Sequence, residues 1–314
     1  MQRRDFVGTL GAAALGMMLP LTRGKAASLK ATPAGAAAGT RSSGAARLGR
    51  IGLELYTLRN VMPKDPVGTL AAVRRMGYTD VELLWSFDNF GLTTAQVKAA
   101  LEANGLRAPS AHMDPATFLT GWERSLETAK LLGHEYLIVP SLPTETSRTL
   151  DDWREWADRF NAAGATARRA GIWLAFHNEA EHMKPIDGRI PYDVFVERLD
   201  PSVVRLQLDT GNMLIGGGDP MQYLAKYRDR YWSFHLKDVV ADRSRDTQFG
   251  TGIFDFKRFL EAVPALDSKP TYVEHETAVD ELDAARKDFA YLRDLDFTPR
   301  SAGAPPARSG GAGA

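Results

Sequence analysis

The sequence contains no cysteine among its 314 residues. This absence excludes disulfide bonds, a thiolate zinc site and a cysteine nucleophile, whatever the compartment. A metal bound by this protein therefore has to use histidine, aspartate or glutamate side chains. Histidine is itself scarce, with only six in the chain, so any site that needs many imidazoles is disfavoured.

A net charge is also missing, because 39 basic residues balance 39 acidic ones. No large electrostatic field then favours a polyanion such as DNA or an anionic membrane surface. Small neutral molecules fit this composition better as partners. Hydrophobic residues make up 44% of the chain and charged residues 25%, which is typical of an ordinary globular protein with one deep core.

Long apolar runs are absent except for one, at residues 7–21. It follows the pair Arg3 and Arg4 and precedes small residues at 24–27, where a signal peptidase could cut. The run is shorter than the roughly 20 residues that a membrane-spanning helix needs. This layout predicts a twin-arginine signal peptide at residues 1–27 and a periplasmic or secreted protein without stable membrane insertion. An amphipathic start or a membrane anchor is the alternative.

The two ends of the remaining chain differ in composition from its middle. Residues 28–47 and 298–314 are rich in small residues, glycine and proline, which predicts a flexible linker and a flexible tail. The body at residues 48–297 is close to the typical size of one (β/α)₈ barrel.

Short β-rich runs alternate with helical patterns through this body, which indicates a parallel sheet covered by helices. The predicted strands are residues 51–56, 80–83, 107–112, 136–139, 172–177, 204–209, 231–235 and 271–274. The predicted helices are residues 66–76, 94–103, 121–132, 151–170, 192–199, 220–227, 256–262 and 284–295. Eight pairs predict an α/β protein built as a single (β/α)₈ TIM barrel, and an open doubly wound sheet is the alternative.

Five predicted strands end on an ionisable residue that a purely structural strand does not need. These residues are His112, His177, Asp209, His235 and Glu274. In a barrel, all carboxyl ends of strands meet at one mouth, so the five would become neighbours. Two imidazoles and two carboxylates suit one divalent ion such as Mn²⁺, Co²⁺, Zn²⁺ or Mg²⁺. The alternatives are hydrogen-bonded structural histidines and, for Asp209, the cap of the following helix.

A resemblance to a known family covers residues 51–295. It rests on the order and spacing of IGLELYTLR at 51–59, DPVGTL at 65–70, MGYTDVE at 76–82, FHNE at 176–179, LDTGN at 208–212, HLKD at 235–238, GTGIFDF at 250–256 and VEHE at 273–276. The chain resembles the xylose-isomerase-like barrels known as sugar phosphate isomerases/epimerases. This resemblance implies metal-dependent proton abstraction next to a carbonyl group.

The ligand set of the family's epimerases carries over to this sequence with one departure. Those enzymes hold one metal ion with Glu, Asp, His and Glu at the ends of strands five to eight. The last three correspond to Asp209, His235 and Glu274, whereas the first falls on His177. In the epimerases that first glutamate also moves a proton, so the histidine puts two-base epimerisation in doubt. Glu179, two residues further on, is the alternative ligand and carboxylate.

The resemblance implies roles for the other polar residues as well. Glu274 and either His177 or Glu179 are expected to move the proton. Lys237 and His112 are expected to contact substrate oxygens, although Lys237 is equally consistent with a solvated loop lysine. The remaining substrate-binding candidates, on weaker grounds, are Glu82 and Asn212.

These residues predict a sugar isomerase or epimerase that acts on a non-phosphorylated sugar, because an exported enzyme does not meet sugar phosphates routinely. A lyase or dehydratase acting on a keto-sugar or 3-keto-glycoside is the main alternative. An abasic-site endonuclease would need three zinc ions and a histidine where Asn212 stands. A non-catalytic sugar-binding module and a homo-oligomer are left open.

Overall fold

The computed structural model describes residues 46–298 of the chain. The predicted signal peptide at residues 1–27 lies outside the described residues, so export stays a prediction. The predicted linker and tail also lie almost wholly outside them. Ordered pairing begins at Ala46, whose backbone exchanges two hydrogen bonds with Phe297 and so joins the two ends of the body. None of the helices in residues 46–298 is long and apolar enough to cross a membrane.

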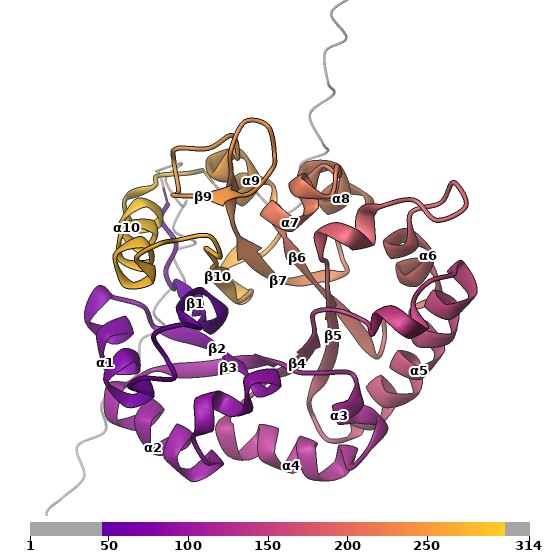
Figure 1. Ribbon diagram of the computed structural model, residues 1–314, viewed down its shortest axis with the longest axis horizontal. Coiled ribbons are helices and arrows are strands. Elements are labelled where there is room, and N and C mark those ends of the chain that lie inside the picture. The colour runs from indigo at the N-terminus through magenta and orange to yellow at the C-terminus, as the bar shows by residue number, and fades with distance from the viewer. Residues whose placement is uncertain (1–45, 299–314) are drawn as a thin grey trace, which may run out of the picture. The chain divides into compact units, whose positions relative to one another are not determined.

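Eight parallel strands close into a barrel, viewed from the end where the strands finish in Figure 1. The strands are β1 (Gly52–Glu54), β2 (Asp80–Leu84), β3 (Arg107–His112), β4 (Tyr136–Val139), β5 (Trp173–His177), β6 (Val204–Asp209), β7 (Tyr231–Leu236) and β10 (Thr271–Val273). Strand β1 pairs with both β2 and β10, which closes the ring. The predicted single (β/α)₈ barrel is therefore confirmed, and the open sheet is excluded.

Helices surround the barrel on its outside (Figure 1). They are α1 (Pro66–Met76), α2 (Thr94–Asn104), α3 (Ala116–Leu119), α4 (Trp122–Leu132), α5 (Leu150–Arg169), α6 (Pro191–Arg198), α7 (Thr210–Ile215), α8 (Pro220–Lys226), α9 (Phe256–Ala262) and α10 (Glu281–Asp294). Helix α5 shows why these segments are helical: Thr149 and Asp152 form a capping box at its start. Its buried stripe of Trp153, Trp156 and Phe160 then packs on the barrel.

The carboxyl-terminal mouth carries elements that the sequence patterns did not predict. The first predicted strand is too long, because Leu55–Leu58 forms a 3₁₀ turn that begins directly after Glu54. A two-stranded antiparallel hairpin, β8 (Asp238–Val239) and β9 (Asp246–Thr247), follows β7. The carboxylate of Asp238 accepts hydrogen bonds from three backbone amides of the loop after the hairpin, at Gly250, Gly252 and Phe254. These extra segments build the walls around the strand ends.

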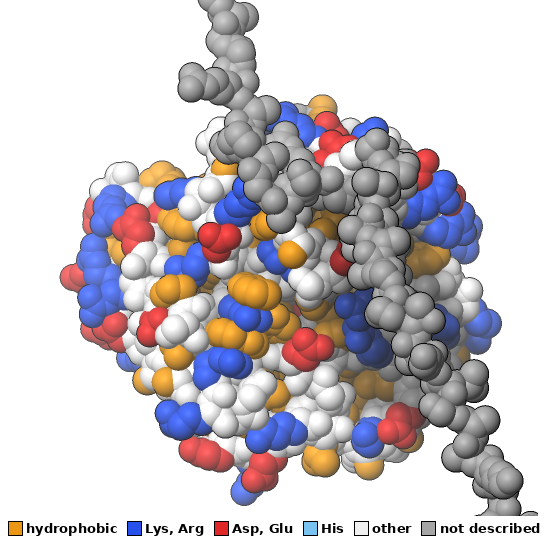
Figure 2. Space-filling view, turned by 180° about the vertical axis from the view of Figure 1, so that it is seen from behind, with side chains coloured by type: hydrophobic (Ala, Val, Ile, Leu, Met, Phe, Trp, Pro, Cys, Tyr) orange, Lys and Arg blue, Asp and Glu red, His pale blue; other side chains and the backbone are white. Residues whose placement is uncertain are grey.

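The opposite end of the barrel is closed by stacked aromatic and basic side chains. The guanidinium carbon of Arg205 lies 3.5 Å from the ring centroid of Trp173 and 3.4 Å from that of Trp232. All three residues belong to the first half of their strands. Figure 2 views the molecule from this side and shows hydrophobic and basic side chains adjoining one another near the middle of the face. This end therefore serves stability, and the polar strand ends lie on the other side.

His134 gives the fold a predicted dependence on pH. Its ring is buried, Nδ1 lies 2.5 Å from the carbonyl oxygen of Ala108, and burial lowers its pKa from 6.5 to about 4. Because the unfolded chain binds the proton more readily, this contribution is complete above pH 6.5 and is lost as the pH falls towards 4. We expect a loss of about 2 kcal/mol in unfolding free energy from this residue between pH 7 and pH 4.5.

The variant His134→Asn tests this expectation, since an asparagine amide can replace the Nδ1 donor but does not titrate. Urea unfolding at pH 7 and pH 4.5 should show a smaller acid-induced loss of stability in the variant than in the wild type. Identical losses in the two proteins would assign the pH dependence to other groups.

Candidate metal and proton-transfer site

Four of the residues predicted from the strand ends come together at the mouth of the barrel. His177 ends β5, Asp209 ends β6, His235 is the fifth residue of β7, and Glu274 directly follows β10. One ligand atom from each lies within 4.8 Å of those of the other three. All four residues are buried, with at most 5% of their surface exposed. The closed parallel sheet brings together residues that are almost 100 positions apart.

Asp209 caps the helix that follows its strand, as one of the two predictions for it had it. Its Oδ1 accepts a hydrogen bond of 2.6 Å from the backbone amide of Asn212 and so caps α7. Its Oδ2 is buried and accepts no hydrogen bond of good geometry, but it lies 3.0 Å from the ammonium Nζ of Lys237. Capping therefore uses one oxygen only, and the other pairs with Lys237 within the ligand group.

His177 has an unusual environment for a buried imidazole. Neither ring nitrogen has a hydrogen-bond partner. The nearest carboxylate oxygens are those of Glu179, at 3.5 Å from Nδ1, and Asp209, at 3.6 Å from Nε2. Burial lowers the pKa of His177 to about 4, so the ring is neutral and offers a lone pair. Buried polar atoms without partners are costly. A divalent ion would satisfy both His177 and Asp209, so these residues fit a metal site.

Glu274 is the carboxylate of this group with the strongest charged neighbours. Its Oε2 lies 2.8 Å from Nδ1 of His235 and 3.2 Å from Nζ of Lys237. Burial opposes ionisation, but these two groups outweigh it and hold the pKa of Glu274 well below its usual range. The pKa of His235 is raised to about 10, since burial is outweighed by the carboxylates of Glu82 and Glu274. Glu274 is therefore an ionised base at neutral pH.

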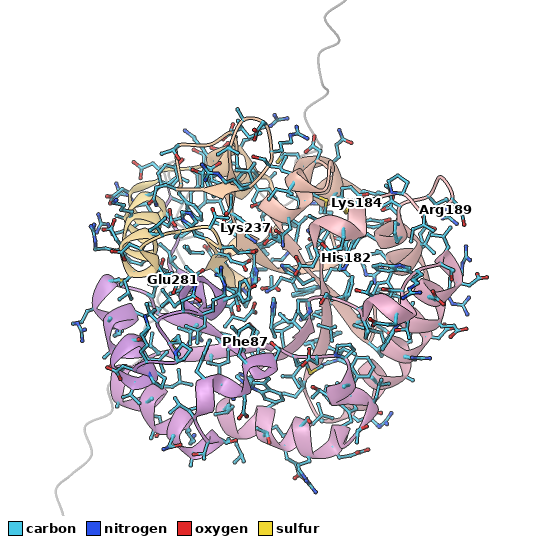
Figure 3. The ribbon with its side chains drawn as sticks, viewed as in Figure 1. Phe87, His182, Lys184, Arg189, Lys237 and Glu281 are labelled. Atoms are coloured by element: carbon cyan, nitrogen blue, oxygen red, sulfur yellow. The ribbon has the colours of Figure 1, made fainter. Side chains whose placement is uncertain are left out.

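Lys237 lies inside the barrel mouth and is only 1% exposed, so the alternative of a solvated loop lysine is wrong (Figure 3). Its Nζ lies 3.0 Å from Oδ2 of Asp209, contacts Glu276 and donates to Oδ1 of Asn212 over 3.1 Å. Burial would lower the pKa of Lys237, but the carboxylates of Asp209, Glu274 and Glu276 raise it well above its usual value. Three carboxylates, those of Asp209, Glu274 and Glu276, therefore share the ammonium of Lys237.

The structure separates His177 from Glu179, which the sequence left as alternatives. His177 belongs to the four-residue ligand group, and Glu179 does not. Glu179 instead accepts a hydrogen bond of 2.7 Å from Nδ2 of Asn212, with 28% of its side chain exposed. Burial of its carboxyl group raises the pKa of Glu179 well above the usual range. Its backbone amide donates to Nδ1 of His182, which stacks on Phe176, so the loop after β5 is anchored.

A cavity of about 230 Å³ opens above the ligand group. His112, His177, Glu179 and Glu274 line it, whereas Glu82 and Asn212 are not among its lining residues. Two further lining residues, Tyr56 and Glu276, escaped the sequence analysis. Glu276 stands two positions after Glu274, and that spacing was the available signal for it. Tyr56 was placed inside a strand, so nothing in the sequence pointed it at the cavity.

The fold and the site together define a closed (β/α)₈ barrel with a cluster of metal-type ligands at its mouth. The family model described as xylose isomerase-like TIM barrel matches residues 70–295, and the chain belongs to this family. An inosose dehydratase of Geobacillus kaustophilus is 33% identical over 104 residues. That match covers 33% of this chain and 33% of the relative, so the chain spans only about a third of that protein's length in the alignment.

Solved structures of related barrels are similar over nearly their whole length. A sugar phosphate isomerase/epimerase of Parabacteroides distasonis is 25% identical with a TM-score of 0.69, covering 78% of this chain and 98% of its own. A 3-keto-D-glucoside 4-epimerase of E. coli is 24% identical with a TM-score of 0.59, covering 78% and 99%. The IOLI protein with a bound zinc atom is 14% identical with a TM-score of 0.59, covering 76% and 95%. The last two likenesses concern the fold alone.

Proposed function

We propose that this protein is a metal-dependent isomerase or epimerase that removes the proton next to the carbonyl group of a non-phosphorylated keto-sugar or keto-cyclitol. The observation that carries the proposal is the group of buried donor atoms around Glu274. Both ring nitrogens of His177 lack hydrogen-bond partners there, and Oδ2 of Asp209 has only the ammonium of Lys237 beside it. Such an arrangement suits a bound cation beside an ionised base.

The proposed ligands are His177, Asp209, His235 and Glu274. A divalent ion at this position would supply Lewis-acid stabilisation of the negative charge that develops on the carbonyl oxygen. The ligand types suit Mn²⁺, Co²⁺, Zn²⁺ or Mg²⁺. The zinc atom bound by the similar IOLI barrel supports a bound metal, and both its position and its identity in this chain are part of the proposal.

The chain's own residues have separate tasks in the proposed reaction. Glu274 takes the proton from the carbon next to the carbonyl group, and the electron pair of that C–H bond moves towards the carbonyl oxygen. Glu179, which lines the cavity from the side of β5, returns a proton to carbon. Return to the same carbon inverts it and yields an epimer. Return to the former carbonyl carbon, with transfer of the hydroxyl proton between the two oxygens, yields an aldose/ketose isomer.

The charge of the cavity supports a substrate without phosphate. Its lining residues include Glu179, Glu274 and Glu276, and none of the lining residues in the described part of the chain is lysine or arginine. The one ammonium nearby, on Lys237, is already paired with the carboxylates of Asp209 and Glu274. A phosphate dianion would meet like charges, whereas hydroxyl groups could hydrogen-bond to the same carboxylates.

Elimination is the second candidate, and His177 is the observation in its favour. A carboxylate at this place serves the second proton transfer in the epimerases that the sequence resembles, and here an imidazole without hydrogen-bond partners replaces it. In an elimination, Glu274 would take the proton, the bond from the next carbon to its oxygen would break, and the carboxyl group of Glu179, whose pKa is raised by burial, would protonate the departing oxygen. The products are an unsaturated ketone and water or an alcohol. The inosose dehydratase relative supports this alternative.

The proposed function is tested by incubating the metal-loaded protein in D₂O with keto-sugars, keto-cyclitols and 3-keto-glycosides and following each by proton NMR. We expect loss of the signal of the proton next to the carbonyl group, followed by an epimer or isomer. A new vinyl proton together with released alcohol would identify elimination instead. Chelated protein and phosphorylated substrates are the controls, and both should react more slowly. Cleavage of abasic DNA, or exchange with none of these substrates, would overturn the proposal.

A further inference from the structure

A second polar layer lies beneath the ligand group, centred on Glu82 of β2. Glu82 is fully buried. Its carboxylate accepts hydrogen bonds from Oγ of Ser110 and, at 3.0 and 3.1 Å, from Nε2 of Gln207. Its Oε1 also lies 2.5 Å from Nε2 of His235 and 3.0 Å from Nε2 of His112. The carboxylate of Glu82, which belongs to β2, therefore contacts side chains from three other strands, β3, β6 and β7.

The donors around Glu82 make this carboxylate an acceptor for both histidines. Ser110 and Gln207 both donate, so each ring is expected to direct an Nε2–H at Glu82, and Nε2 of His112 also lies 2.8 Å from Oε1 of Gln207. Nδ1 of His235 faces the ligand group, at 2.8 Å from Oε2 of Glu274 and 3.9 Å from Oδ2 of Asp209. Without a metal ion this nitrogen carries a proton directed at Glu274, and a bound ion would replace that proton while Nε2–H stays on Glu82. His112, in turn, lines the cavity above.

We infer that Glu82 is a positioning residue that orients two histidines at once by accepting at their Nε2 atoms, the metal ligand His235 and the substrate contact His112. This inference rests on the proposed function for the roles of those two residues. Histidines that bind metal commonly donate their other ring N–H to a carboxylate, which orients the ring and raises its basicity as a ligand. Here the carboxylate of Glu82 also contacts His112, which lines the substrate cavity. One residue therefore positions both a metal ligand and a substrate contact.

The same atoms offer a competing reading as a second metal site. Ligand atoms of Glu54, Glu82, His112 and His235 also lie within 4.8 Å of one another, and Oε2 of Glu54 is buried without a hydrogen-bond partner. Two facts favour a hydrogen-bonded support instead. His235 belongs to both groups, and Glu82 already has hydrogen bonds with three side chains, with Nε2 of His112 a further 3.0 Å contact. The experiment below separates the two readings.

The test compares Glu82→Gln with Glu54→Gln, a matched control in which the same change is made to a neighbouring carboxylate that is equally buried. A glutamine at position 82 offers one oxygen and one NH₂ group, so it cannot accept from both rings. In the metal-free full-length protein, ¹⁵N–¹H correlation spectra of the histidine side chains report which nitrogen is protonated. We expect Nε2–H on His112 and His235 in the wild type and in Glu54→Gln. In Glu82→Gln the Nε2–H signal of His235 should be lost or strongly shifted, because this nitrogen loses its carboxylate partner at 2.5 Å, whereas Nε2 of His112 keeps Oε1 of Gln207.

The second readout is the affinity for Zn²⁺ alone, measured by competition with a chromophoric chelator. Glu82→Gln should bind Zn²⁺ about 10- to 100-fold more weakly, the usual effect of losing such a partner, and Glu54→Gln should bind nearly as the wild type. Circular dichroism and thermal melting check that each variant is folded. If Glu82→Gln does not fold, Glu82→Asp replaces it. Aspartate keeps the charge but has a shorter reach, and it should weaken Zn²⁺ binding while retaining both Nε2–H protons.

Unchanged protonation and affinity in the Glu82 variant would overturn the inference. An equal loss of Zn²⁺ affinity in Glu82→Gln and Glu54→Gln would also overturn it. The same holds if the wild type binds a second Zn²⁺ ion that neither variant binds. Neither readout needs turnover. The protein could show the expected changes in the histidine spectra and in Zn²⁺ affinity and still convert none of the sugars tested. In that case the role of Glu82 would be supported, and only the proposed reaction would be contradicted.

Discussion

Glu274→Gln is expected to lower the rate of proton exchange next to the substrate carbonyl by about 10²-fold or more, in line with the usual contribution of a general base. Glutamine keeps the shape of the side chain and one ligand oxygen, but it loses the charge and the basicity. The buried surroundings are polar, with His235 at 2.8 Å and Lys237 at 3.2 Å from Oε2, so the amide remains accommodated and the fold should persist.

The measurement is the exchange of the substrate proton next to the carbonyl group with solvent deuterium. It is made at saturating metal concentration, so that weaker metal binding is not mistaken for loss of the base. Glu276→Gln is the matched control, because it removes a carboxylate from the same cavity two residues further on. It should reduce exchange much less than Glu274→Gln does. Equal exchange in Glu274→Gln and the wild type would mean that Glu274 is not the base, and the role would pass to His177 or Glu179.

Removal of the metal is expected to have the other large effect. We expect about one divalent ion per purified chain, because four ligands saturate one ion in a typical site. Chelation should lower exchange by about 10³-fold, since a Lewis-acidic ion contributes several kcal/mol. Elemental analysis of the reconstituted protein gives the stoichiometry. No metal after reconstitution, or a stable count near three, would contradict the proposed site.

Asp209→Asn isolates the metal from the helix cap. Asparagine caps helices about as well as aspartate, so the bond from Oδ1 to the amide of Asn212 can remain while the charge is lost. Asp219→Asn is the control, because Asp219 caps α8 in the same way through the amides of Met221 and Gln222. Both variants should melt near the wild-type temperature, and only Asp209→Asn should lose metal and activity. If Asp209→Asn and Asp219→Asn both lost metal and activity, the role of Asp209 would be purely structural.

Much of the barrel could be predicted from local patterns. The bounds of β3, β4 and β6 agree with the prediction, because each is a continuous run with clear ends. The helix predicted over residues 66–76 ends as expected, because Gly77 follows it with a φ of 115°. A side chain at that position would also collide with the ring of Phe289. Local backbone preference and later packing thus favour the same residue.

The short elements at the barrel mouth were missed, because their conformation depends on distant partners. The hairpin of β8 and β9 has only two residues in each strand, which is too few for an alternating pattern to be recognised. The carboxylate of Asp246 holds it to the backbone amide of Thr277, 31 positions away. No window of neighbouring residues contains that information.

The sequence by itself determined the eight strand and helix pairs, the absence of thiolate chemistry, and the set of strand-end residues that a barrel must gather. Strand periodicity and the closing of a parallel sheet are general enough to place His177, Asp209, His235 and Glu274 at one mouth. Only the tertiary structure decided that Lys237 is buried among carboxylates, that Glu179 is bonded to Asn212, and that Glu82 lies below the cavity. Those outcomes depend on which side chains from different strands lie at the same level along the barrel axis. The hydrogen bonds and the burial of these side chains follow from that arrangement, and the sequence of a single strand does not contain it.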